Sequence, residues 1–254
     1  MARFAVISDI HANKSALDAV FAAIDVAGIP ETICLGDIIG YGPDPEYCTD
    51  LVRARCSHVV RGNHDHALFH GATHFNPWAR DALLYTRSRL DPRQVCDAAA
   101  RARWEWLRSL PLMSWRGSFL FIHGTPRDPL NDYLYADSPD LGDEQELGHI
   151  FDPVAHAMFC GHTHVPCHIR SDGCSADIQE DGASLELDPE LKHVVNVGSV
   201  GQPRDGNPRA SWVEVDGISV QFHRTPYDIE ATASRILATG FLDPFLAERL
   251  AEGV

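Results

Sequence analysis

The chain has 254 residues, 44% hydrophobic and 22% charged, which is the composition of a folded globular protein. Its 21 basic and 36 acidic side chains give a formal net charge of −15, the wrong sign for coating a nucleic acid or attaching to an anionic membrane surface. No apolar run approaches the roughly 18 residues of a membrane span, and the seven scattered cysteines are typical of reduced thiols, so we expect a cytoplasmic protein.

The first forty residues predict a strand, a helix and a second strand. Residues 3–8 form a short, β-branched apolar run that is typical of a buried strand. Apolar side chains then recur at helical spacing on one face, at Leu17, Val20, Phe21 and Ile24. Ser15 and Asp18 fit a capping box at the start of this helix. A second apolar run at 32–35 completes a parallel β-α-β crossover, which we expect to be right-handed.

The middle of the chain alternates between helical and extended patterns. We expect a helix over 45–56 and a short strand over 58–61. Residues 77–110 are predicted to be helical, and residues 115–124 return to a strand. Glycine and proline then become frequent between 124 and 139, which indicates a long loop.

The last hundred residues consist of short strands and turns. Residues 211–223 predict a hairpin, because Asp216 and Gly217 form a favoured two-residue turn between alternating runs. The acidic segment 171–192 is expected to be an irregular surface insertion, and an amphipathic helix is predicted over 229–238.

The chain therefore begins with parallel strands and ends with antiparallel ones. Two mixed β-sheets packed face to face, with helices outside, accommodate both patterns. We expect a single domain of mixed α/β class over residues 1–254.

Five of the strand-like runs end in side chains that can bind a metal. These side chains are Asp9 with His11, Asp37, Asn63, His123, and His162 with His164. Because ligands bind outside the carboxyl ends of the strands in α/β sheets, all five endings can converge on one crevice. Both members of each closely spaced pair would point the same way if the chain stayed extended there.

The seven donors comprise two carboxylates, one amide oxygen and four imidazoles, more than one tetrahedral ion can use. If one carboxylate bridges, two ions about 3.5–4 Å apart become possible, an arrangement used for in-line attack at phosphorus. Oxygen and nitrogen donors without thiolate suit manganese, iron, zinc or cobalt and do not choose among them.

Residues 160–168, with the sequence CGHTHVPCH, allow two interpretations. Thiolates and imidazoles so close together could form a structural zinc knuckle. In the other interpretation only His162 and His164 bind metal. Cys160 is then the last buried residue of a strand, and Cys167 and His168 lead away from the site.

The motif set resembles that of the calcineurin-like metallophosphoesterase superfamily: D-x-H at 9–11, G-D at 36–37, G-N-H-D at 62–65, an isolated H-G at 123–124, and G-H-T-H at 161–164. The resemblance covers most of the chain. It implies a four-layer αββα sandwich, a dinuclear metal centre, and hydrolysis of a phosphate ester or anhydride by a hydroxide held between the ions. One ion would be bound by Asp9, His11, Asp37 and His164, and the other by Asp37, Asn63, His123 and His162.

The same resemblance assigns roles to the residues beside the ligands. His64 would lie over the substrate, where it stabilises the transition state or protonates the leaving oxygen. Asp65 would either orient His64 or begin a helix. Both are named as candidate catalytic residues.

Four further residues are candidates for substrate binding, each with a structural alternative. Arg61 would bind the phosphate or form a salt bridge at a strand end. Arg127 and Arg204 lie in Gly/Pro-rich loops, where each would bind a second phosphate or only contact solvent. Tyr41 would stack on a substrate group or pack its loop.

The segments GDIIGYGPDP, HGTPRDP and NVGSVGQPRDG resemble a compact prokaryotic branch of the superfamily that includes phosphodiesterases, diadenosine-tetraphosphate hydrolases and phosphoprotein phosphatases. This resemblance implies a phosphoesterase that hydrolyses phosphodiester or phosphoanhydride bonds of small nucleotide-type substrates. A serine/threonine phosphoprotein phosphatase, which Arg61 would favour, is the first alternative. A non-catalytic scaffold of the same fold, as in one retromer subunit, is the second.

Overall fold

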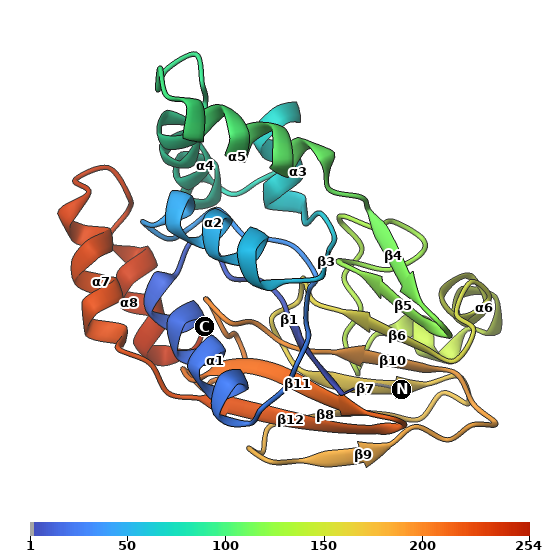
Figure 1. The fold of residues 1–254 in the computed structure, drawn as a ribbon. Coiled ribbons are helices and arrows are strands. Elements are labelled where there is room, and N and C mark those ends of the chain that lie inside the picture. The colour runs from blue at the N-terminus through green and yellow to red at the C-terminus, as the bar shows by residue number, and fades with distance from the viewer. Residues whose placement is uncertain (1–2) are drawn as a thin grey trace.

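The computed structural model describes residues 3–254 and arranges the strands in two six-stranded sheets (Figure 1). The strand order in the first sheet is β3 (His58–Val59), β2 (Thr32–Cys34), β1 (Phe4–Ile7), β11 (Ala210–Asp216), β12 (Ser219–Thr225) and β9 (Ser184–Glu186). The order in the second is β4 (Met113–Arg116), β5 (Phe119–Ile122), β6 (Ala157–Cys160), β10 (His193–Asn196), β7 (Cys167–Arg170) and β8 (Ser175–Asp177). Parallel and antiparallel pairs occur in both sheets, so both are mixed.

The helices lie outside the pair of sheets. They are α1 (Lys14–Val26), α2 (Pro45–Arg55), α3 (Asn63–His70), α4 (Pro77–Leu90), α5 (Ala98–Ser109), α6 (Glu144–Phe151), α7 (Ile229–Ala238) and α8 (Phe245–Glu252), with a 3-10 turn at Pro139–Gly142. Helix α1 packs on the first sheet and α6 on the second, while α3, α4 and α5 form a group at one end (Figure 1). The mixed α/β sandwich expected from the sequence is thereby confirmed.

Strand β1 shows how the layers are held together. Phe4 and Val6 pack between the sheets against aromatic rings of the second sheet, with ring centroids of Phe4 and Phe121 6.0 Å apart. Ala5 and Ile7 point the other way, into the cluster that contains the apolar face of α1. Both faces of the strand are therefore buried, which explains why its sequence is a continuous apolar run rather than an alternating one.

Three local predictions differ from the structure. Helix α1 begins after Asn13, whose side chain accepts a hydrogen bond from the Ala16 amide at 3.1 Å, so the capping box at Ser15 is wrong. The helical stretch 77–110 is two helices, because Asp91 leaves the helical conformation and Asp97 caps the next helix. The strand over 115–124 is part of the hairpin β4–β5, which turns at Gly117 with φ of 61°.

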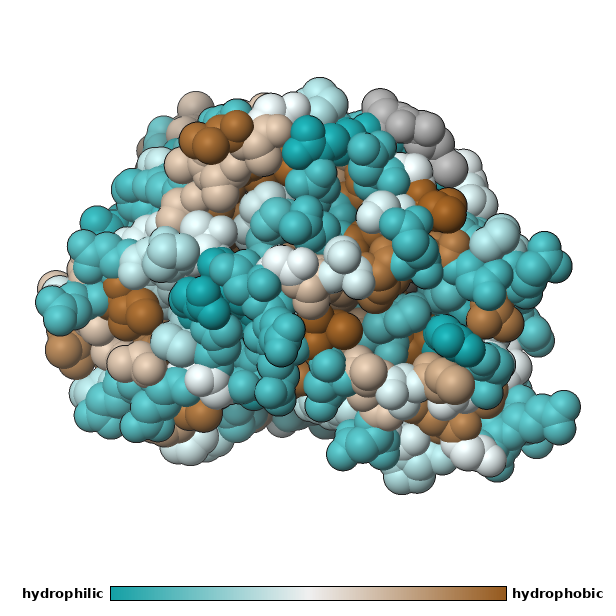
Figure 2. All heavy atoms as spheres, turned by 90° about the horizontal axis from the view of Figure 1, so that it is seen from below, coloured by the Kyte–Doolittle hydropathy of each residue, from teal (hydrophilic) through white to brown (hydrophobic). Residues whose placement is uncertain are grey.

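The acidic segment 171–192 is more regular than expected, since β8 and β9 add a short edge strand to each sheet. Within residues 3–254, no helix is both long enough and apolar enough to cross a membrane. On the face shown in Figure 2, hydrophilic residues predominate and apolar residues form small groups between them.

Candidate metal centre

The seven predicted ligands meet at the carboxyl ends of neighbouring strands, and the histidine and aspartate ligands among them are buried. The segments after β1, β2, β5 and β6 carry Asp9 with His11, Asp37, His123, and His162 with His164, while Asn63 begins α3. The chain is not extended there. Asp9, His11, Asp37, His162 and His164 all have left-handed backbones, with φ between 48° and 67°. Such conformations are uncommon for residues other than glycine, and they concentrate at functional sites.

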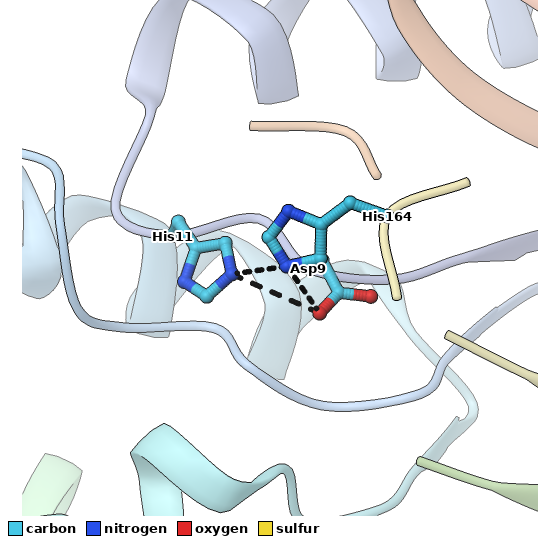
Figure 3. Close-up of side chains that lie close together, drawn as sticks. All are labelled: Asp9, His11 and His164. Carbon is cyan, nitrogen blue, oxygen red and sulfur yellow. Dashed lines mark hydrogen bonds and ion pairs between the residues drawn. The ribbon is translucent and has the colours of Figure 1, made fainter. Parts of the chain in front are cut away.

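One group of donors consists of Asp9, His11 and His164 (Figure 3). The Nε2 atom of His164 lies 3.1 Å from Oδ1 of Asp9 and 3.0 Å from Nε2 of His11. Nε2 of His11 lies 3.7 Å from Oδ1 of Asp9. Three donor atoms from segments 153 residues apart thus face one point.

Hydrogen bonds to the backbone fix which nitrogen faces the site. Nδ1 of His11 lies 3.2 Å from the Ile39 carbonyl, and Nδ1 of His164 lies 2.5 Å from the Gln202 carbonyl. Because a carbonyl only accepts, both Nδ1 atoms carry the proton, and both Nε2 atoms present lone pairs. Oδ1 of Asp9 also has no hydrogen-bond donor among the described residues. Buried lone pairs this close repel one another, so this donor set fits a metal cation.

The second group consists of Asn63, His123 and His162. Nε2 of His123 lies 3.2 Å from Oδ1 of Asn63 and 3.0 Å from Nδ1 of His162. Nδ1 of His123 donates to the Leu35 carbonyl at 3.0 Å, so its Nε2 atom also presents a lone pair. This group repeats the chemistry of the first with an amide oxygen in place of the Asp9 carboxylate.

Asp37 lies between the two groups. Its Oδ2 atom is 3.7 Å from Nε2 of His11 and 3.6 Å from Nε2 of His123. Its Oδ1 atom accepts a hydrogen bond from the His64 amide at 2.8 Å, which fixes the carboxylate. Among the residues described, Asp37 is the one carboxylate within 4 Å of an imidazole nitrogen from each group, as a bridging ligand requires.

Burial keeps the histidines of the centre neutral. It lowers the pKa of His11 and His123, and it lowers the pKa of His162 to about 2. Burial and then the nearby Arg204 lower the pKa of His164 to about 4. Neutral imidazole is the form that binds a metal ion, so these ligands are ready at neutral pH.

The two carboxylates differ. For Asp9, burial raises the pKa, but the neighbouring imidazoles, His164 first among them, favour the carboxylate more strongly, and the net pKa is well below its usual value. Burial and the neighbouring Asp9 raise the pKa of Asp37 well above its usual value. A bound cation relieves the repulsion between two ionised carboxylates that are buried side by side, and so favours the ionised form of Asp37.

His64 lies beside the ligands in an aromatic enclosure. Its ring centroid is 4.8 Å from that of His11, 4.7 Å from Tyr41 and 4.8 Å from Phe75. Only 4% of the residue is exposed, and its Nδ1 atom has no partner among the described residues. Burial, followed by the charge of Arg204, lowers its pKa, so the ring is neutral.

Asp65 is occupied elsewhere. Its Oδ2 atom accepts from the Gly62 amide at 3.0 Å, and its Oδ1 atom accepts from the Ile38 amide at 3.1 Å. No hydrogen bond joins it to His64 in the part of the chain that the structure describes. Asp65 therefore caps α3 and holds the loop that carries Asp37, which agrees with the helix-start alternative and not with orientation of His64.

Arg204 and Tyr41 lie at the edge of the centre. The Nη2 atom of Arg204 donates to Oε1 of Gln202 at 2.8 Å, and its guanidinium lies 5.8 Å from the centre of the Tyr41 ring. Arg204 forms no ion pair with a described carboxylate, and its charge lowers the pKa of His11 and His64. It is a cation available to an anionic ligand.

The other two predicted arginines are not brought to this edge. Nη2 of Arg61 donates to the carbonyl of Arg108 near the end of α5, where it compensates the negative end of the helix. The guanidinium of Arg127 is bonded by three carboxylates, Asp132, Asp140 and Glu146, at 2.6–2.8 Å. Neither contact supports a role in phosphate binding. The other prediction for Arg127, that it only contacts solvent, is also wrong, because its guanidinium belongs to a network of ion pairs.

The cysteines of 160–168 are not ligands. Cys160 and Cys167 pair with opposite sides of Asn196 in β10, so β10 separates them. Burial raises the pKa of Cys160 well above its usual value and raises that of Cys167 to about 12, which keeps both as thiols. None of the described metal-ligand groups contains a cysteine, and the zinc-knuckle interpretation is wrong.

A cleft of about 390 Å³ opens beside the centre. Its lining residues are Tyr41, Asn63, His64, His74, Phe75, Asn76, Asn131, Tyr133 and His162. The sequence did not single out Phe75, Asn131 or Tyr133. The one signal available was the pair of tyrosines in the loop after His123, at Tyr133 and Tyr135.

Comparison with known proteins agrees with this geometry. The family model of the calcineurin-like phosphoesterase superfamily domain matches residues 2–217. A protein of Methanocaldococcus jannaschii is 34% identical over 256 residues, which cover 97% of this chain and 96% of that protein.

Solved structures show the same relationship. A metallophosphoesterase from Sphaerobacter thermophilus is 36% identical, with a TM-score of 0.83 over 100% of this chain and 99% of that chain. A candidate diadenosine tetraphosphatase is 16% identical, with a TM-score of 0.50 over 89% of this chain and 94% of that chain, and shares the fold. The chain therefore belongs to the calcineurin-like phosphoesterase superfamily and is a metal-dependent phosphoesterase.

Proposed function

We propose that the protein hydrolyses phosphodiester or phosphoanhydride bonds of small nucleotide-type substrates at a dinuclear metal centre. The observation that carries this proposal is the position of Asp37, with Oδ2 within 3.7 Å of an imidazole nitrogen of each donor group. Asp9, His11 and His164 would complete one ion's ligands, and Asn63, His123 and His162 the other's. Manganese, iron, zinc and cobalt all suit these donors.

Two such ions, when bound, would supply an acidified water molecule and would neutralise charge on the phosphate. The protein's own residues position the substrate. Arg204, with no carboxylate partner among residues 3–254, would bind a phosphate oxygen at the edge of the centre. His64, which is neutral, would donate a hydrogen bond from its ring N–H to the reacting phosphate, or its unpaired ring nitrogen would take a proton from the attacking water and pass a proton to the leaving oxygen.

An anhydride or diester fits this site better than a phosphoprotein. The phosphoprotein alternative depended on Arg61, whose guanidinium instead bonds the Arg108 carbonyl. The neighbour described as a candidate diadenosine tetraphosphatase has the same fold and supports trying dinucleoside polyphosphates first.

The test is turnover of bis-p-nitrophenyl phosphate and diadenosine tetraphosphate by the manganese-reconstituted protein. We expect hydrolysis that a chelator abolishes, and a His64→Ala variant that keeps its metal but loses about 10²–10⁴-fold in kcat. Absence of metal-dependent turnover of both substrates would contradict the proposal. Faster turnover of phosphoserine peptides than of either substrate would favour the phosphatase alternative.

A further inference from the structure

The cleft beside the centre lies between two loop segments, 71–76 and 131–133, that contain none of the predicted metal ligands. The segment 71–76, between α3 and α4, contributes His74, Phe75 and Asn76. The segment after β5 contributes Asn131 and Tyr133. Tyr41 and three residues of the centre, Asn63, His64 and His162, complete the wall. A ligand whose phosphate lies at the metals would therefore extend its remaining part into this cleft.

The lining combines aromatic rings and amides without carboxylates. Tyr41, Phe75 and Tyr133 supply the rings, and none of the nine lining residues is aspartate or glutamate. The chain has a formal net charge of −15, so a wall without carboxylates is a place where an anionic ligand meets little repulsion. The aromatic rings of this wall favour a ligand that also has a flat, apolar part.

Tyr133 is the most exposed of these rings. The residue is 48% exposed, yet its ring is held 3.9 Å from the ring of His162, with an interplanar angle of 32°. The ring of Tyr135 lies nearly parallel to it, at 6.2 Å and 6°. A large aromatic side chain that is oriented by its neighbours and remains accessible provides a surface for stacking.

The two amides offer complementary hydrogen-bonding atoms. Nδ2 of Asn131 donates to Asp128 at 3.1 Å, and its Oδ1 atom accepts no hydrogen bond from residues 3–254. Oδ1 of Asn76 accepts from the Ala79 amide at 2.9 Å, and its NH₂ group donates to none of the same residues. A donor and an acceptor beside aromatic rings match the polar edge of a purine or pyrimidine.

The loop that carries Asn131 and Tyr133 is anchored by Arg127. This guanidinium joins Asp132 of the loop to Asp140 and Glu146, which belong to the 3-10 turn and to α6. The anchored loop reduces the entropy lost when a ligand binds. Arg127 is thus a positioning residue for the cleft.

We propose that this cleft is the base-binding subsite of the enzyme, in which a nucleobase stacks on Tyr133 and contacts Phe75 while its phosphate occupies the metal centre. The assignment rests on the proposed function for the position of the phosphate. It goes further by naming the part of the substrate that the protein recognises and the residues that recognise it.

Calorimetric binding of AMP and ribose 5-phosphate to the manganese-reconstituted protein tests the assignment. The two ligands share the sugar phosphate and differ in the base, and chromatography after each titration checks that they are intact. We expect AMP to bind about 5- to 100-fold more tightly than ribose 5-phosphate, the range for one stacked base. In Tyr133→Ala this preference should disappear, with ribose 5-phosphate affinity within about twofold of wild type.

Two further variants separate stacking from other effects. Tyr133→Phe keeps the ring and should keep the preference for AMP. Trp115→Ala removes an equally exposed aromatic residue, 54% accessible, on the edge strand β4, and should change neither affinity. Metal content is measured for every variant, because Tyr133 contacts the ligand His162.

Equal affinity of the wild type for AMP and ribose 5-phosphate would overturn the assignment, and so would an equal loss of both affinities in Tyr133→Ala with metal retained. Failure of the proposed function looks different. It would appear as absent hydrolysis, and a preference for AMP that depends on Tyr133 would still support the subsite.

Discussion

The imidazoles of the centre are oriented by backbone carbonyls rather than by other side chains. The carbonyls of Ile39, Leu35 and Gln202 accept the Nδ1 protons of His11, His123 and His164, respectively. These three histidines therefore face the site with Nε2. His162 is the exception, since its Nδ1 atom faces His123. The sequence shows which residues are histidines, but the choice of nitrogen depends on carbonyls that no motif contains.

Removal of single ligands should release single ions. Because His164 belongs to one donor group and His162 to the other, His164→Ala and His162→Ala should each lower metal content from about two ions per chain to about one. Cys160→Ser and Cys167→Ser should leave it unchanged, since both thiols pack in an apolar core cluster and belong to neither donor group. Inductively coupled plasma mass spectrometry after reconstitution measures this. Loss of metal from either cysteine variant would refute the assignment.

Gly62 allows the backbone of α3 to approach Asp37. A Cβ atom at this position would lie 2.0 Å from Oδ1 of Asp37, although the φ of −87° suits alanine. Because the added Cβ would also lie 2.3 Å from the backbone nitrogen of Asp37, Gly62→Ala should displace both the backbone and the carboxylate of Asp37 and lower metal affinity by about 10- to 100-fold. Metal-competition titration measures the change.

The matched control is Gly142→Ala, where no atom lies within 4 Å of the added Cβ. This variant should keep wild-type metal affinity. Equal affinities of the Gly62→Ala variant and the wild type would show that the Asp37 position is not critical.

Among the elements, the loop between β5 and α6 contributes most to the cleft and was least predictable. Its glycines and prolines indicated a loop, but loops have no periodicity that fixes where a side chain points. Arg127 illustrates the limit. From the sequence it was a candidate phosphate ligand, whereas its three partners, Asp132, Asp140 and Glu146, come from parts of the chain whose proximity only the fold defines.

Arg127→Met should loosen this loop without affecting the metals. The substitution keeps most of the side-chain length and removes the charge that joins the loop to α6. We expect AMP affinity to fall about 2- to 10-fold, because binding must then order a few groups that Arg127 holds in place in the wild type. Metal content should stay unchanged. Calorimetry measures the affinity, and limited proteolysis within 124–138 should become faster.

Arg93→Met is the control for loss of an arginine ion pair. Arg93 pairs with Asp91, and neither residue lines the cleft. It should leave AMP affinity unchanged. If Arg127→Met also left affinity and proteolysis unchanged, Arg127 would have no positioning role.

For the whole molecule, the architecture was more predictable than its details. The buried run of β1 and the spacing of apolar residues in α1 determine how the layers pack, because burial on both faces leaves little choice of residue type. The left-handed backbones at Asp9 and His11 were not predictable. Aspartate and histidine adopt that conformation more often than most residue types, yet only in a small minority of cases, so the surrounding packing and not the residue type imposes it here.

The stability of the whole fold should depend on a histidine pair in the second sheet. Nε2 of His168 lies 2.9 Å from Nδ1 of His193, across the strands β7 and β10. Burial, followed by the charges of His193 and Arg170, lowers the pKa of His168 to about 4, although Asp172 raises it slightly. Burial also lowers the pKa of His193, against the opposing effects of Asp188.

The sign of the pH dependence follows from these shifts. Above about pH 6.5 the histidine is neutral in both states, and its contribution to the free energy of unfolding is complete. As the pH falls from 6.5 toward 4, the unfolded chain takes up a proton that the folded chain does not, so stability is lost. From pH 7 to pH 5 the wild type should lose about 1 kcal/mol more than His168→Gln, after allowance for partial solvent exposure. Urea unfolding at the two pH values measures both proteins, and equal losses would mean that His168 is protonated in the fold.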